Sequence, residues 1–286
     1  MNGVEIAIWA VVAFTLVYEP VFGYLDYRRF KRKAGTDDGA RIRLYVRTMI
    51  GLWLPVLYIL GVVGLTDVTL ADIGFALPGF DIGPLGPPAT YAVTALVSLY
   101  ALALAYHGIG YRVSAAMRAK MDRLREERVG KAAFADMLPV TDRERKWWAA
   151  VSVTAGIAEE IIYRGFLFFA FSRLFPSLSV WGVILFTAVL FGLAHTYQGV
   201  AGVIRTGAVG AVFAMLFAVT GSILPLVVLH FLIDLMARAE SGAKRAEAEG
   251  TRADANGTPH GGTPHGGTPH GDPLHGDPPH GGTLHG

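Results

Sequence analysis

Three apolar stretches of this sequence contain side chains that could perform acid–base chemistry. In chain order the residues are Glu159, Glu160, Arg164, His195, His230 and Asp234. A charged group at bilayer depth costs roughly 2.5 to 3.5 kcal/mol on insertion scales, so such residues are expected to face a polar interior. Carboxylates and imidazoles are the commonest general acids and bases of enzymes. The pattern therefore predicts a chemical site between helices inside a membrane.

The two adjacent carboxylates are expected to differ in environment. Glu160 precedes Arg164 by four residues, a spacing at which a helical glutamate can pair with a cation. Glu159 is then about 100° away around the helix. One carboxylate would be neutralised while its neighbour is free for acid–base work, which is the separation expected of a catalytic pair.

The third stretch places His230 and Asp234 four residues apart, on one helix face. Asp234 could orient His230 by accepting its ring N–H, or both could point at one substrate atom. Two other interpretations stay open. Polar side chains can simply hold membrane helices together, and intramembrane Glu, Arg and His can serve a transporter. No inverted repeat between the two halves supports a transporter.

Helices must position these residues, because the chain has the composition of a membrane protein. Apolar residues make up 52% of the 286 positions and charged residues 17%, against about 25% charged in soluble domains. We predict an all-α fold, a polytopic transmembrane bundle of about seven spans. The spans begin near Val4, Thr48, Ala89, Trp147, Leu178, Val200 and Gly221.

Charge and cysteine content exclude several classes of protein. The net charge of +2 gives no reason to expect a nucleic-acid partner. The chain contains no cysteine, which excludes disulfides, a thiol nucleophile and Cys-ligated metal. The expected partner from these features is the lipid bilayer, and no pattern indicates an oligomeric state.

Basic residues predict the orientation in the membrane. Lysine and arginine gather in residues 28–47 and 112–146 and are absent from 48–111. Basic loops face the cytoplasm, so we predict a multi-pass protein of a cell inner membrane with its N-terminus outside and its tail cytoplasmic. The first stretch, Val4 to Tyr18, has neither a basic flank nor a cleavage site and is predicted to be a retained helix.

Four regions are expected. Residues 1–111 hold three spans, 112–146 form a cytoplasmic connector, 147–238 form the catalytic core, and 239–286 form a tail. The connector has apolar residues at helical spacing among basic ones, which fits either an amphipathic helix on the membrane or a plain linker. Thr141 and Glu144 fit a capping box that opens the fourth span.

The tail repeats a Pro/Gly unit with histidines at five-residue intervals from residue 260 to 285. A segment of this composition is not expected to form a packed core, and we predict that it is disordered. Imidazoles bind zinc and nickel, but a flexible tail offers no preorganised coordination sphere, so a specific metal site is not expected there.

The three motifs together resemble one family. EExxxR at 159–164, FxxxH at 191–195 and HxxxD at 230–234, in this order on successive apolar stretches, are similar to the CPBP family. That family comprises CAAX prenyl endopeptidases of the Ras-converting type and bacteriocin-processing or immunity relatives. The resemblance covers approximately residues 147–238. It implies a helical intramembrane protease with a cavity open to the cytoplasmic side, and a peptide or membrane-protein substrate.

The resemblance also implies roles for the residues. Glu159 would act with His195 to activate a water, and Glu160 with Arg164 would hold the site together. His230 and Asp234 would stabilise the oxyanion. Family members commonly have Asn where Asp234 stands, and a carboxyl can donate to an oxyanion only when protonated.

The family mechanism needs no cofactor, and none is predicted. The alternative is a divalent metal held by a mixed set of carboxylates and imidazoles, since these suit catalytic zinc, although the sequence has no HExxH helix. The candidate ligands are Glu159, His195, His230 and Asp234. A further alternative is a catalytically silent scaffold or immunity protein that binds a partner.

Overall fold

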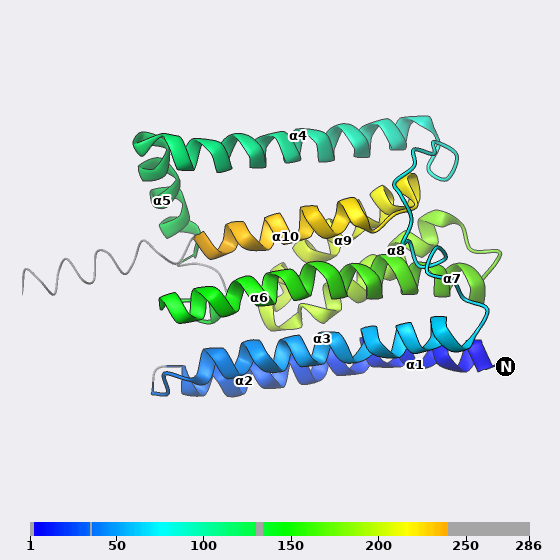
Figure 1. The fold of residues 1–286 in the computed structure, drawn as a ribbon, viewed down its shortest axis with the longest axis horizontal. Coiled ribbons are helices and arrows are strands. Elements are labelled where there is room, and N and C mark those ends of the chain that lie inside the picture. Colours follow the sequence, from blue (N-terminus) through cyan, green and yellow to red (C-terminus); the bar gives the residue numbers. More distant parts are fainter. Residues whose placement is uncertain (1–2, 35, 130–133, 240–286) are drawn as a thin grey trace, which may run out of the picture. The chain divides into compact units, whose positions relative to one another are not determined.

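The computed structural model describes residues 3–34, 36–129 and 134–239, and within them every regular element is a helix (Figure 1). The all-α prediction is therefore confirmed. The α-helices are α1 (Gly3–Val17), α2 (Tyr24–Lys33), α3 (Ala40–Leu65), α4 (Pro87–Val113), α5 (Ala115–Val129), α6 (Asp142–Glu159), α7 (Phe168–Leu174), α8 (Val180–Ala194), α9 (Gly199–Thr220) and α10 (Leu224–Ala239). Two segments are π-helical, η1 (Tyr18–Gly23) and η3 (Glu160–Leu167), and two are short 3₁₀ turns, η2 (Ala135–Met137) and η4 (Thr196–Gln198). The histidine-containing repeats lie outside the described residues.

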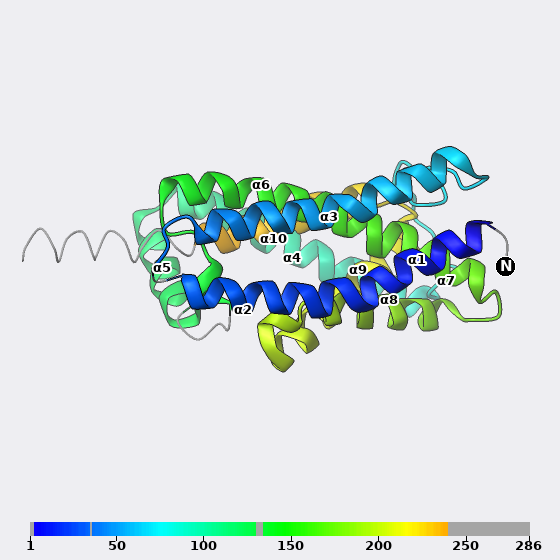
Figure 2. The same ribbon diagram turned by 90° about the horizontal axis from the view of Figure 1, so that it is seen from below.

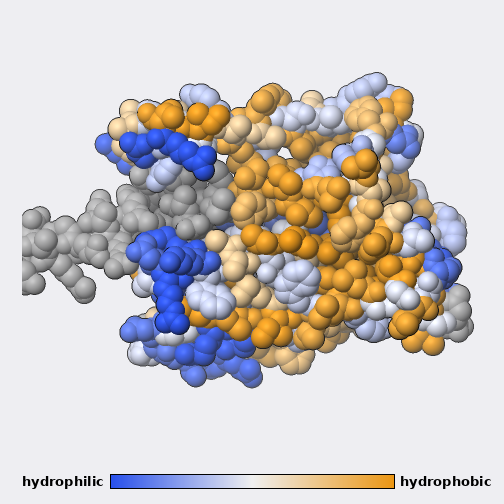
Figure 3. Space-filling model, viewed as in Figure 1, coloured by the Kyte–Doolittle hydropathy of each residue, from blue (hydrophilic) through white to orange (hydrophobic). Residues whose placement is uncertain are grey.

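The chain is a membrane protein. Four helical stretches are long and apolar enough to cross a bilayer, and two shorter apolar helices accompany them, Val180–Ala194 and Leu224–Asp234. Together with the stretch from α6 through α7, these helices follow the order of the seven predicted spans, and the number of them that cross the bilayer stays a prediction. Apolar residues cover the middle of the visible face, and hydrophilic residues gather at the end where α2 ends and α5 lies (Figure 3).

The first span is longer than the predicted Val4 to Tyr18. The chain stays helical through Pro20, and α1, η1 and α2 run as one continuous helix to Lys33 (Figure 2). Proline has no N–H and crowds the preceding turn of an α-helix. A wider π turn accommodates it without ending the helix, so Glu19 lies inside the span instead of in a loop.

The predicted capping box begins α6. The Thr141 hydroxyl accepts from the Glu144 N–H, and the Glu144 carboxylate accepts from the Thr141 N–H at 2.9 Å. Arg41 of α3 lies 3.4 Å from the Glu144 carboxylate and donates to the Asp136 carbonyl at 2.9 Å. These contacts fix the start of the helix that carries the site.

The connector contains the helix α5 within residues 112–146. This agrees with the helical spacing of its apolar residues, while its placement on a lipid surface stays a prediction. The α4 helix before it lies at the periphery and packs against α5 and α9 (Figure 1).

The core surrounds η3. Ile162, Phe166 and Leu167 of this segment are fully buried. The loop between α3 and α4 closes one side, and its Ile73 is also fully buried. The Gly79 N–H of this loop bonds the Thr220 carbonyl at 2.8 Å. The loop therefore packs on the end of α9 and against the segment that carries Glu160 and Arg164.

A substitution at Gly165 tests this packing. A Cβ at Gly165 would lie 2.6 Å from the Ile73 carbonyl oxygen, so a backbone would have to move. Gly165→Ala is expected to destabilise the protein by about 1 to 3 kcal/mol, as overpacking does. Thermal unfolding in detergent measures it. Gly61→Ala, which meets no atom within 4 Å, is the control, and equal midpoints for the two variants would contradict the close approach.

Candidate functional site

A close contact between α6 and α10 brings two of the motifs together. A Cβ at Gly156 would lie 3.2 Å from the Phe231 nitrogen and 3.3 Å from the Val227 carbonyl oxygen. Only a residue without a side chain permits this approach of the two backbones. It places His230 beside the carboxylates that follow Gly156 on the next turn.

Glu160 is the centre of the site. Arg164 Nη1 donates to Glu160 Oε1 at 2.9 Å, which is the predicted ion pair. His230 Nδ1 lies 2.6 Å from the same oxygen. The Glu160 and Arg164 side chains are 0% and 1% exposed. A charge removed from water is tolerated only when it is paired and hydrogen-bonded. The buried Glu160 carboxylate therefore holds the side chains of Arg164 and His230 in position.

This arrangement orients His230. An ionised carboxylate only accepts, so the ring donates its Nδ1–H to Glu160. The opposite nitrogen, Nε2, lies 3.7 Å from Glu159 Oε2 and 3.8 Å from Asp234 Oδ2. These distances are too long for direct hydrogen bonds and suit a bridging water. The orienting contact that the sequence suggested for Asp234 is therefore made by Glu160.

His195 lies at the end of α8. Its Nδ1 is 2.8 Å from the Phe191 carbonyl oxygen, so Nδ1–H donates there and Nε2 keeps its lone pair. The Phe191 ring is 4.9 Å from the His195 ring and 6.3 Å from the His230 ring, centroid to centroid. Among the described residues, no hydrogen bond or ion pair joins His195 to Glu159. Their cooperation stays a prediction.

Aromatic rings enclose the arginine. The Arg164 guanidinium carbon lies 4.1 Å from the centre of the Phe191 ring and 5.2 Å from that of Phe213. A guanidinium over a ring face is attracted by the ring quadrupole, and more strongly where water is excluded. Arg164 is thus held by Glu160 on one side and by ring faces from α8 and α9.

Several polar atoms of the cluster have no hydrogen-bond partner. Within the described residues, Glu159 Oε2, Glu160 Oε2 and Arg164 Nη2 are buried and unbonded. Buried polar atoms in proteins are nearly always bonded, and exceptions are frequently functional. These atoms are therefore available to a water molecule or a substrate group.

Sequence reasoning missed two residues of this cluster. Tyr163, which is 1% exposed, donates its hydroxyl proton to Glu19 Oε2. Glu19 was overlooked because the first span was predicted to end at Tyr18. A single carboxylate inside an apolar stretch was the signal that could have found it.

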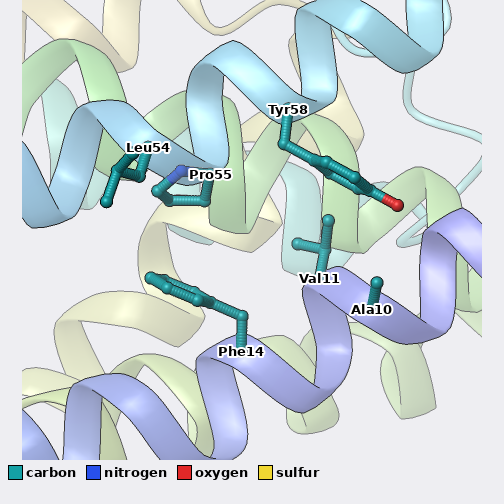
Figure 4. A pocket seen from close by; sticks show the side chains of 6 residues that line it. All are labelled: Ala10, Val11, Phe14, Leu54, Pro55 and Tyr58. Carbon is teal, nitrogen blue, oxygen red and sulfur yellow. The ribbon is translucent and has the colours of Figure 1, made fainter.

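A separate hollow lies between α1 and α3. Figure 4 shows its lining, Ala10, Val11, Phe14, Leu54, Pro55 and Tyr58. The phenol of Tyr58 is its single polar side chain, so the hollow has no acid–base pair.

The carboxylates and imidazoles of the cluster are residue types that also bind metal ions. In the ranges that the structure describes, no three His, Asp or Glu side chains are grouped in a way that could hold a metal ion.

Comparison with known proteins identifies the central region. Residues 143–236 match the family described as Type II CAAX prenyl endopeptidase Rce1-like. The match covers about one third of the chain, from α6 into α10, and includes all three motifs. No curated protein and no solved structure matches this chain.

Proposed function

This chain belongs to the CPBP family through its Rce1-like domain at residues 143–236, and we propose that it is an intramembrane endopeptidase that hydrolyses peptide bonds with a glutamate-activated water. The family is a protease family. One observation supports the finer proposal most strongly: Glu159 Oε2 is buried and without a hydrogen-bond partner, 3.7 Å from the imidazole that Glu160 orients.

The chemistry follows from this arrangement. Glu159 removes a proton from a water, and the water oxygen attacks the peptide carbonyl carbon. The protonated Glu159 then gives its proton to the amide nitrogen as the C–N bond breaks. A positioned general base contributes typically 10²- to 10⁴-fold. Glu159 alone thus accounts for the movement of the proton.

The imidazoles assist this reaction. A protonated His230 Nε2 donates to the carbonyl oxygen as negative charge develops there, and such donors are worth roughly 10²- to 10³-fold each. His195 Nε2 keeps its lone pair, so it can accept a hydrogen bond from the attacking water and help to position it. Asp234, whose carboxylate lies 3.8 Å from His230 Nε2, acts on that ring by its charge.

The expected substrate is a peptide or a membrane protein that reaches the site within or beside the bilayer. The protein is proposed to lie in a cell inner membrane with its N-terminus outside. Arg41 and the start of α6 then lie near the cytoplasmic surface, where basic residues are favoured.

A comparison of peptide termini tests the proposal. Membrane and secreted peptides are sequenced from cells that carry the wild-type protein or Glu159→Gln at equal levels. Termini present only with the wild type are expected, and the purified wild type is expected to produce them in the presence of a chelator. Loss of cleavage with chelator would instead favour the metal alternative. Identical termini in both cell types would favour the scaffold or immunity protein.

A further inference from the structure

Glu19 contacts the site through Tyr163, although it lies far before the family-matched residues 143–236 in the sequence. It belongs to η1, at the centre of the first span. None of the three motifs includes it. Its contacts therefore have to be judged from the structure itself.

The first contact joins Glu19 to the catalytic segment. Tyr163, which donates to Glu19 Oε2, lies on η3 between Glu160 and Arg164. The Tyr163 ring also packs edge-on against Phe191, at 5.1 Å between centroids. Tyr163 is thus held at its hydroxyl by η1 and at its ring by α8.

A second contact joins the same short segment to the histidine of α8. The Thr196 hydroxyl donates to the Pro20 carbonyl oxygen at 2.8 Å, and Thr196 directly follows His195. Two consecutive residues of η1 therefore bond to the glutamate motif and to the residue that follows the His195 motif. The first span links the glutamate segment to the His195 turn.

The environment of Glu19 is costly for a carboxylate. Its Oε1 is buried and has no hydrogen-bond partner among the described residues, and no salt bridge to a cation is present there for Glu19. It also interacts electrostatically with Glu159. Carboxylates inside a bilayer are rare and are, by default, functional candidates. An apolar side chain at position 19 would pack in the bundle without the cost of burying a carboxylate.

Both linked segments are π-helical. η1 carries Glu19, and η3 carries Glu160, Tyr163 and Arg164. π turns are rare and occur frequently at functional sites. A wide turn needs outside contacts to hold it, and the hydrogen bond between Tyr163 and Glu19 is such a contact for η3.

We propose that Glu19 is a positioning residue of the proposed peptidase: through Tyr163 it holds the η3 segment, and with it the carboxylate of Glu159, in the geometry that hydrolysis requires. The catalytic unit then includes the first span as well as the family-matched domain. This inference rests on the proposed function for its kinetic consequence only, because the anchoring of η3 can be measured without a substrate.

Hydrogen exchange measures the anchoring first. Amide exchange of residues 160–167 is followed by mass spectrometry in the full-length protein in lipid nanodiscs. Glu19→Leu and Tyr163→Phe each remove the bond and are expected to speed exchange there about 10-fold, because local opening becomes easier. Glu19→Gln keeps an oxygen that accepts from Tyr163 and is expected to match the wild type. Glu5→Gln, on the first turn of α1, is the control. Unchanged exchange in Glu19→Leu and Tyr163→Phe would overturn the proposal.

Kinetics then test the consequence, with a synthetic peptide that spans a cleaved bond. Glu19→Leu is expected to lower kcat about 10- to 100-fold, as small misplacements of reacting groups do, and to change KM less than about 3-fold. Glu19→Gln is expected to rescue kcat. Tyr163→Phe should reproduce the loss, and the double variant should lose no more, since residues that act as one unit are not additive.

The outcomes separate the two proposals. Faster exchange together with a wild-type protein that cleaves no peptide would overturn the proposed function and leave the anchoring role intact. Full kcat in Glu19→Leu, measured with an active wild type, would overturn the positioning role. Fully additive losses in the double variant would show that Glu19 does not act through Tyr163 and would overturn it as well.

Discussion

Glu159→Gln is expected to lower kcat for peptide hydrolysis by about 10²- to 10⁴-fold while the protein stays folded. The amide has the size of the carboxylate but cannot accept the proton of the attacking water, so the loss is that of a general base. Glu159 Oε2 makes no hydrogen bond within the described residues, so the substitution breaks none at that atom. Turnover of the peptide and thermal unfolding in detergent measure the two effects.

The control for this variant is Glu5→Gln, the same chemical change on the first helix. Glu5 precedes Glu19, the residue of that helix that joins the cluster, by 14 positions, which is about 20 Å along the helix. It is expected to retain full turnover. A Glu159→Gln protein that still cleaved at the wild-type rate would assign the base to another residue, with His195 the first to test.

Arg164→Met is expected to have the largest effect on stability. It removes the arginine partner of Glu160, whose side chain is fully buried, and leaves His230 as the one remaining partner of that charge among the described residues. Breaking a buried pair in this way costs about 3 to 5 kcal/mol. It also removes the guanidinium from the faces of Phe191 and Phe213. Thermal unfolding in detergent should show a large fall in the midpoint.

A double variant separates stability from activity. Glu160→Gln in the Arg164→Met background removes the buried charge that has lost its arginine, so it is expected to recover a large part of the lost stability. It also removes the negative charge beside His230 Nδ1, so activity should stay low. Equal unfolding midpoints for the single and the double variant would contradict the assignment of Glu160 as the buried partner.

Helix content, the order of the apolar spans and the capping box at Thr141 were predictable because each depends on neighbours in the chain. A run of apolar residues near the length of a bilayer, or a threonine three residues before a glutamate, acts through local geometry. The ion pair of Glu160 with Arg164 was predictable for the same reason, since four residues of helix bring the two together.

The helix ends were less predictable. The α3 helix begins at Ala40, not near Thr48, because a helix can continue past the apolar run into a basic flank. The first span passes through Pro20 instead of ending at Tyr18, because a π turn replaced the break that proline usually causes.

The sequence by itself determined that this is a helical membrane protein with six candidate residues in three motifs. Only the tertiary structure decided their partners. Glu160 rather than Asp234 accepts the His230 ring proton, and Glu19 joins the cluster through Tyr163. Both contacts cross between helices that are far apart in the chain, and they depend on close approaches such as that of α10 to Gly156. Helical periodicity fixes which face a residue occupies, whereas packing fixes which other face it meets.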